Sequence, residues 1–350
     1  MAGLDRLRSV IGDHKGEGRM ISRIWLTYKQ HRFETIAVTV LCLGAAVGAI
    51  VEAWRINSVG VPPSCLVDGW VPSWFDPSAG VTACQLASQR FRDVANGADV
   101  SLVRQAGQLL PFLAGIAIGA PLVAREIEQG TAPLSWSLSG SRRKWLLARM
   151  LAAVVLFVPL LIVLGLASDV QQAAAFPGVD AHASFYDHTS RGVAIVFWGL
   201  AALFVTIALG TFLGRTFPAV LLGLFVLLLG RGLWEVALDA TVLRPLAVLE
   251  LPGVSTPGEY VVYSGDLYLD GKPWQGDVNA WWQAQVVCTQ TAAVTECGSP
   301  ESLQGPEYSQ FVIHGDQYWP VVARECAIML LGSLCFGAVA LFWVGRRRPY

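Results

Sequence analysis

Six long windows without a charged residue constrain this sequence more than any other feature. They are Thr35–Val51, Gln105–Ala124, Met150–Ser168, Gly192–Gly214, Thr216–Gly230 and Ala327–Gly345. A helix needs about 20 apolar residues to cross roughly 30 Å of hydrocarbon. The fifth window is short and has to continue through Arg231 and Glu235. We therefore predict an all-α polytopic membrane protein with six transmembrane helices.

The composition excludes several other classes of protein. Of the 350 residues 54% are hydrophobic and 15% are charged, and the net charge is -1. Soluble domains carry about 25% charged residues. A disordered chain and a nucleic-acid binder are both excluded. A soluble bundle of six buried core helices is disfavoured, because such helices rarely stay free of charge over this length.

The placement of Lys and Arg predicts the orientation in the membrane. Sixteen of these 25 residues lie in the N-terminal arm, the loop after the second window, the turn after the fourth and the C-terminal tail, whereas residues 240–320 contain only Arg244 and Lys272. Cytoplasmic loops carry the excess of basic residues, so we expect both termini to be cytoplasmic. The predicted divisions are a cytoplasmic arm (1–33), five spans (34–238) with an outer loop (56–104) and a cytoplasmic loop (125–149), an ectodomain (239–319), and the last span with its basic tail (320–350).

Four cysteines form two pairs, each within one predicted outer loop. Cys65 and Cys84 lie in the first outer loop, and Cys288 and Cys297 lie in the ectodomain. An oxidising compartment permits such pairs, so we predict the disulfides Cys65–Cys84 and Cys288–Cys297, with four free thiols as the alternative.

The ectodomain is predicted to be small and mainly β. Residues 259–274 have the pattern of a strand, a turn and a strand, and residues 280–297 are a candidate second hairpin.

Two segments on the predicted cytoplasmic side have an amphipathic or apolar character. In Met20–Phe33, Trp25 and Tyr28 lie on one helical face and basic residues lie elsewhere, which is typical of a helix in the membrane interface. A plain juxtamembrane anchor is the alternative. In residues 125–149 the second helix continues to Glu128, and Gly130 and Pro133 then break it.

The break is followed by an apolar segment that contains Leu134 and Trp136 and then by the basic residues 142–144. Spacing alone leaves two places for this segment, a cytoplasmic partner or the lipid surface.

Arg231, Glu235 and Asp239 are spaced to share one helical face near the outer end of the fifth span. A charge at that depth usually faces protein or a wet cavity. The three residues are either a polar patch along a translocation path or a structural Arg231–Glu235 pair. The predicted outer loop between the third and fourth windows contains His182, Asp187 and His188, but without a rigid framework such residues seldom bind a metal, and we predict no metal site.

The cytoplasmic loop closely resembles that of ABC-2-type transporter permeases, the membrane subunits of ATP-driven exporters. The residues that carry this resemblance are Ala124, Arg125, Glu126, Glu128, Gly130, Thr131, Trp136, Ser141, Arg142 and Trp145. The stretch 25–32, the turn 215–219 and the segment 308–319 are also similar to the family, with Lys29 in place of an arginine.

The resemblance implies partners and roles. Such a permease pairs with a second one, identical or paralogous, and two ATPase subunits bind ATP and Mg at the cytoplasmic face. The implied coupling helix would contact the ATPase through Glu126, Glu128, Gly130, Thr131, Leu134, Trp136, Arg142, Arg143 and Trp145. The implied elbow helix contains Trp25, Tyr28 and Arg32. Simple positive-inside anchoring remains the alternative for the basic residues, and a solvated helix face for the two glutamates.

The predicted function is therefore the permease subunit of an ABC-2-type exporter in a bacterial plasma membrane. We find neither a Walker A motif nor a nucleophile elbow in these 350 residues. We expect no catalytic residue and no cofactor in this chain, with ATP hydrolysis in a partner. The apolar spans suggest an amphipathic or hydrophobic substrate. The alternative is a complex that signals to, or acts mechanically on, envelope partners through its ectodomain.

Overall fold

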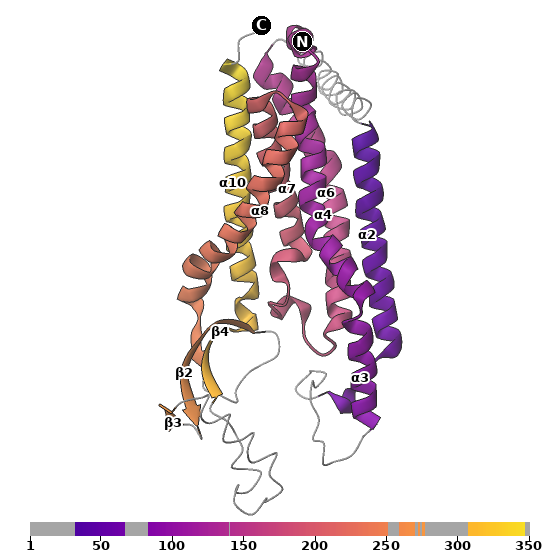
Figure 1. The fold of residues 1–350 in the computed structure, drawn as a ribbon, viewed down its shortest axis with the longest axis vertical. Coiled ribbons are helices and arrows are strands. Elements are labelled where there is room, and N and C mark those ends of the chain that lie inside the picture. Colours follow the sequence, from indigo (N-terminus) through magenta and orange to yellow (C-terminus); the bar gives the residue numbers. More distant parts are fainter. Residues whose placement is uncertain are drawn as a thin grey trace, which may run out of the picture.

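In the described part of the chain, six long helices run along one elongated bundle, and a small sheet lies at one end of it (Figure 1). The computed structural model describes residues 32–66, 83–139, 141–250, 259–269, 272–273, 275–276 and 307–346. The long helices are α2 (Arg32–Val59), α4 (Ala98–Glu128), α6 (Arg142–Ala175), α7 (Gly192–Leu213), α8 (Thr216–Leu238) and α10 (Tyr318–Arg346). All six are long and apolar enough to cross a membrane, which confirms the predicted six-span architecture.

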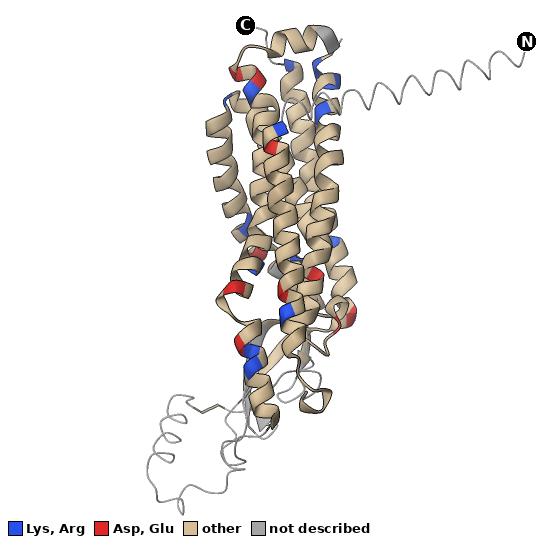
Figure 2. Cartoon of the chain, turned by 90° about the vertical axis from the view of Figure 1, so that its right-hand side faces the viewer, with Lys and Arg blue, Asp and Glu red and all other residues tan. Residues whose placement is uncertain are grey.

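The two ends of the bundle differ in structure. The short helix α5 (Ala132–Ser139) lies at one end, which we call the α5 end, and the strands lie at the other, which we call the sheet end (Figure 1). Charged residues gather toward both ends and are sparse in the middle of the bundle (Figure 2). This distribution is the one expected of helices whose middle lies in hydrocarbon, where a charge is costly.

Several helices are longer than the charge-free windows that predicted them. α4, α6 and α10 each begin before their window, so that Arg142 and Arg143 belong to α6 rather than to a loop. A charge-free window marks the part of a helix in hydrocarbon, whereas the helix itself continues into the interface, where Lys and Arg are tolerated. The fifth helix continues through Arg231 and Glu235, as predicted.

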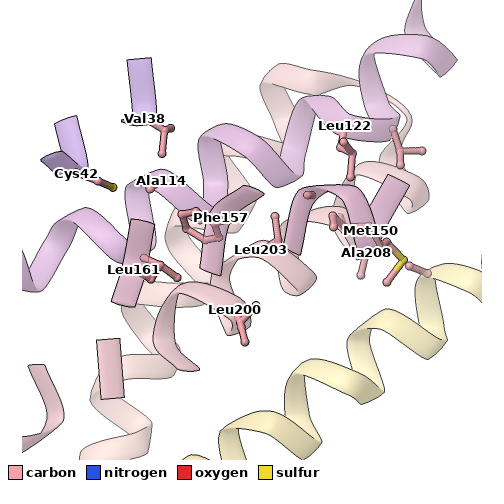
Figure 3. Packing of buried hydrophobic residues seen from close by; sticks show 14 of the residues in the cluster. Val38, Cys42, Ala114, Leu122, Met150, Phe157, Leu161, Leu200, Leu203 and Ala208 are labelled. Atoms are coloured by element: carbon pink, nitrogen blue, oxygen red, sulfur yellow. The ribbon is translucent and has the colours of Figure 1, made fainter. Parts of the chain in front are cut away.

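Helix α7 occupies the centre of the bundle and packs against α4, α6, α8 and α10. Its apolar side chains meet those of α4 and α6 in the largest core cluster (Figure 3). Phe157 and Leu161 of α6 and Leu203 of α7 are fully buried there. Helix α2 lies on the outside of this core and packs mainly against α6.

The backbones of α4 and α7 approach each other closely at two glycines. A Cβ atom on Gly115 would lie 2.8 Å from the carbonyl oxygen of Gly199, and one on Gly119 would lie 2.6 Å from that of Leu203. Real Cβ atoms do not come this close to backbone atoms. The four-residue spacing of small residues is typical of such close contacts between membrane helices.

The predicted outer loop 56–104 contains two helical elements that the sequence analysis did not describe. It contains η1 (Pro63–Cys65) and α3 (Ala83–Ala95). Phe91 of α3 is buried against α2 beside Ile56. Tertiary packing therefore stabilises this helix, which its modest apolar content alone does not predict. The predicted disulfide Cys65–Cys84 is confirmed and joins η1 to α3.

The sheet is antiparallel with the strand order β1-β4-β2-β3. The strands are β1 (Val248–Glu250), β2 (Tyr260–Leu269), β3 (Lys272–Pro273) and β4 (Glu307–Ile313). The predicted strand–turn–strand at 259–274 is the β2–β3 pair. The helical turns η5 (Asp239–Leu243) and η6 (Arg244–Leu246) lead from α8 into β1, and η8 (Gly315–Gln317) leads from β4 into α10.

Some predicted features lie outside the described residues. They are the interfacial positions Trp25 and Tyr28, the disulfide Cys288–Cys297 and the candidate hairpin 280–297.

We predict that Gly119→Val lowers the melting temperature of the purified protein. The added side chain would meet the α7 backbone, and overpacking of a tight core costs about 1–3 kcal/mol. The matched control is Gly44→Val in α2, where a Cβ atom meets nothing within 4 Å. Both melting temperatures are measured in the same detergent. Equal values for the two variants would contradict the close α4–α7 contact.

Candidate functional site

The α5 end is shaped by two local signals for ending and starting helices. After α4 ends, Gly130 has a φ of 70°, a left-handed conformation in which glycine commonly terminates a helix. The backbone nitrogen of Thr131 then donates to the carbonyl of Glu126 at 3.0 Å. Before α6, the Ser141 hydroxyl caps the helix by accepting from the nitrogen of Lys144. These signals leave α5 as a short helix between two longer ones.

Helix α5 is held on α6 by stacked aromatic and guanidinium groups. The rings of Trp136 and Trp145 are both buried and meet edge to face, with centroids 6.2 Å apart. The guanidinium of Arg142 lies 4.7 Å from the centre of the Trp136 ring. Leu134 of the same short helix is 67% exposed. α5 therefore combines a firmly packed inner side with an apolar residue that no described residue covers.

A buried ion pair continues this stack from α6 into α4. Arg149 lies 4.6 Å from the centre of the Trp145 ring and forms an ion pair with Glu126. Its guanidinium also donates to the carbonyl of Leu122 at 3.1 Å. Arg149 and Glu126 are both buried. The side chains from Trp136 to Glu126 thus form a continuous packed connection between α5 and α4, and a displacement of α5 would be transmitted through it.

Helix α4 is in turn connected to two further helices. Arg125 pairs with Glu34 of α2 at 3.0 Å. The Glu128 carboxylate accepts a hydrogen bond from the backbone nitrogen of Thr216 at 3.0 Å. A carboxylate is favourable there because the first turn of a helix has unpaired N–H groups and a positive dipole end. The α5 end thus links five helices, α2, α4, α5, α6 and α8.

The structure brings part of the predicted coupling set together. Trp136, Trp145 and Arg142 form one stack, whereas Glu126 turns inward to Arg149 and does not face outward. Arg143 is exposed, and its guanidinium lies near Gly345 of α10. Arg32, the described member of the predicted elbow helix, is the exposed first residue of α2.

Sequence reasoning assigned no role to Arg149. Two positions in the sequence offered a signal. Arg149 stands directly before the apolar window that begins at Met150, and Glu126 is separated by one residue from the end of the preceding window at Ala124. Glu126 was expected on the continuation of the second helix, but Arg149 was counted only as a loop charge, which concealed that the two residues lie at the ends of adjacent helices and can pair.

A cavity of about 570 Å³ lies toward the sheet end, between α4, α7, α8 and the segment that precedes α7. Arg231 lines it and pairs with Glu235 at 3.1 Å, as one of the two sequence interpretations predicted. Arg231 also donates to the Thr189 hydroxyl at 2.7 Å and lies 5.0 Å from the centre of the Trp198 ring. Asp239, the third member of the predicted patch, begins η5 after α8 has ended.

The segment 176–191 between α6 and α7 is tightly organised by one buried arginine. Arg191 pairs with Asp169 at 3.1 Å and donates to the carbonyls of Ala181, Ser184 and Tyr186. The Tyr186 ring stacks on Phe176, and burial raises the pKa of the Tyr186 hydroxyl. Two short turns, η3 (Ala181–Ala183) and η4 (His188–Ser190), complete the segment.

The same segment is connected to α10 by a buried His–Glu pair. His188 Nε2 lies 3.0 Å from Glu325 Oε1, and Nδ1 lies 3.0 Å from the carbonyl of Phe185. Glu325 is 1% exposed. Among the described residues no group of three His, Cys, Asp or Glu side chains could hold a metal ion. Through its two ring nitrogens, His188 contacts the backbone of its own segment at Phe185 and the side chain of Glu325 in α10.

Comparison with known proteins gives one similarity, to a family of membrane transporters. A family model described as "ABC-2 membrane transporter related" matches residues 70–238, which supports an ABC-2-type permease. The matched region contains α5, the Arg149–Glu126 pair and all the described residues that line the cavity. No curated protein and no solved structure matches the chain. The six apolar helices of the described residues and this similarity support a multi-pass membrane protein.

We predict that Arg149→Leu strongly destabilises the α5 end. Removing one partner of a buried ion pair leaves an uncompensated charge, at a cost of about 3–5 kcal/mol. The double variant with Glu126→Leu should recover much of this loss, because both charges are then gone. The control is Arg125→Gln on α4, whose partner Glu34 lies in a more exposed pair worth about 0–1 kcal/mol. The denaturant midpoint of unfolding is measured in detergent for the unmodified protein, the single variant, the double variant and the control. An Arg149→Leu variant that is no less stable than the control would contradict the pairing.

Proposed function

We propose that this chain is an ABC-2-type permease, the membrane subunit of an exporter, and that α5 is the helix through which a separate ATPase subunit drives it. The observation that carries the proposal is the construction of α5. Its inner side is fastened by Trp136 and Trp145, while Leu134 is exposed at the end of the bundle. A short, firmly based helix with an apolar tip is well suited to fit a groove in a partner protein.

The contacts behind α5 support a coupling role over a lipid-resting one. A helix that only rests on lipid needs no rigid connection to the bundle. Here the stack of Trp136, Trp145 and Arg149 runs from α5 to Glu126 of α4. α4 is bonded to α2 and α8 at the same level. A push on α5 would therefore reach several spans together, as movement driven by ATP hydrolysis in a partner requires.

The proposed complex follows from the same assignment. ATP and Mg would be bound by the ATPase subunits, which would contact the exposed parts of residues 125–149, including Glu128, Leu134 and Arg143. A second permease, a copy of this chain or a paralogue, would complete the membrane part. The complex would lie in a bacterial plasma membrane with both chain termini on the cytoplasmic side. The export substrate would be amphipathic or hydrophobic, in keeping with the apolar spans.

We predict that Leu134→Glu reduces co-purification of an ABC ATPase with the tagged chain. A charge placed in an apolar contact at the centre of an interface costs about 2 kcal/mol or more, roughly a 30-fold loss of affinity. The matched control is Leu86→Glu on α3, an exposed leucine at the sheet end. The measurement is the amount of Walker A-containing protein, and of ATPase activity, eluted with each variant from solubilised native membranes.

Two results would count against the proposed function. One is that the unmodified chain elutes without any ABC ATPase under conditions that preserve membrane complexes. The other is that Leu134→Glu and Leu86→Glu retain equal amounts of the ATPase, which would show that α5 is not the contact.

A further inference from the structure

The cavity near the sheet end has an apolar part and a polar part. Toward the middle of the bundle its wall is apolar, with Phe112 and Leu113 of α4 and Leu224 of α8. Toward the sheet end the polar groups of Gln108, Thr189, Arg231 and Glu235 line it together with the apolar side chains of Phe185 and Leu238. Leu224 precedes Arg231 by seven residues, about 10 Å along a helix. A ligand with an apolar body and a polar head would match this arrangement of apolar and polar lining residues.

The size of the cavity suits such a molecule. Ligand pockets are typically about 300–1,000 Å³ and combine apolar walls with a few placed polar groups. The cavity measures about 570 Å³. Its walls come from α4, α7, α8 and residues 185–190 of one chain. A ligand could therefore bind here before any second permease contributes a residue.

Arg231 is held in position by groups that do not neutralise it. Its guanidinium donates to the Thr189 hydroxyl and lies against the face of the Trp198 ring. Its anionic partner Glu235 has a side chain that is 60% exposed. The protein does not enclose this pair on the Glu235 side, and Glu235 itself lines the cavity, so a ligand there can reach the contact. The bond to Glu235 is thus one that an incoming acid can replace.

The other ionisable groups around the cavity are already engaged. Asp187 lies 3.8 Å from Arg104, and His188 is bound between Phe185 and Glu325. Among the described lining residues Arg231 is the only Lys or Arg. An acidic head would therefore find one oriented guanidinium, with which a carboxylate or phosphate can form paired, charge-assisted hydrogen bonds.

We propose that this cavity binds an acidic amphiphile, with its acidic group on Arg231 in place of Glu235 and its apolar chain along the leucines of α4 and α8. This proposal names a substrate class for the proposed exporter. That the bound amphiphile is an export substrate rests on the proposed function. Binding itself requires neither ATP nor the ATPase, and the two ideas can therefore fail separately.

The test is photolabelling of the full chain in nanodiscs of neutral phosphatidylcholine. The probe is a 12-carbon fatty acid with a diazirine at the end of its chain. Its matched analogues carry an alcohol or a trimethylammonium head. We expect the acid to label peptides of α4 and α8 that line the cavity, and excess dodecanoic acid to suppress this labelling. The two analogues should label these peptides much less.

Three variants give the direction of the effect. Arg231→Gln should reduce labelling by the acid about tenfold, since it removes a hydrogen bond to a charged group. Glu235→Gln should increase it, because a competitor for Arg231 is gone. Arg324→Gln, which removes an exposed arginine of α10 outside the cavity, should leave it unchanged. The Glu235 variant keeps the test decisive even if loss of Arg231 disturbs the Thr189 contact.

A negatively charged phospholipid in the nanodisc distinguishes two sources of the ligand. Competition by phosphatidylglycerol would support an acidic membrane lipid, whereas labelling that it does not affect would support a free acidic amphiphile. The proposal is overturned if the trimethylammonium probe labels the cavity as well as the acid does, if Glu235→Gln lowers labelling by the acid, or if Arg231→Gln behaves like Arg324→Gln. Loss of ATPase co-purification with labelling intact would overturn only the proposed function.

Discussion

The close contact between α4 and α7 is the constraint on which both ends of the molecule depend. Gly115 and Gly119 let the two backbones meet without intervening side chains. Five residues of α4 between Gln108 and Leu113 line the cavity on one side of these glycines, and Glu126 and Glu128 lie on the other. Because protein interiors are close-packed and transmit strain, α4 and α7 should behave as one body. This body connects the α5 end with the cavity.

Helix α8 stands in a different relation to the rest of the bundle. Only 17% of its most apolar window is buried, against 56% for α4 and α7. Its first turn is bonded to Glu128 of α4, and its far part carries Arg231 into the cavity. A shift of the α4–α7 body relative to α8 would therefore change the cavity between them. In the proposed exporter, this is how a push on α5 would act on a bound molecule.

Sequence reasoning succeeded where the membrane or a local signal dictates the structure. Hydrocarbon excludes charge, so the six spans could be recognised from their windows. The end of α4 could be predicted from Gly130, and the disulfide Cys65–Cys84 could be predicted from the presence of both cysteines in one outer loop. The strand pattern at 259–274 likewise depends on nearby residues alone, and the β2–β3 pair follows it.

Sequence reasoning failed where the residue that a side chain contacts lies far away in the chain. Phe91 of α3 is buried because α2 lies beside it. His188 meets Glu325 across 137 positions, and Arg149 meets Glu126 from an adjacent helix. A single sequence shows the charges but not which of them pair. Arg231 and Glu235 could be recognised as a pair because they are four residues apart on one helix.

The pairing of charges separates structural from functional candidates in this bundle. Arg149–Glu126, Arg191–Asp169 and His188–Glu325 each join different segments, and in each at least one partner is almost fully buried. Breaking such a pair leaves a charge in a poorly solvating environment, so these pairs fix the register of the helices at the two ends. Arg231–Glu235 lies within one helix and has an exposed acid, so it fixes no register. A basic group that is oriented by neutral neighbours but weakly neutralised is costly to keep near hydrocarbon. That cost is explained most simply by an acid that arrives from outside the chain.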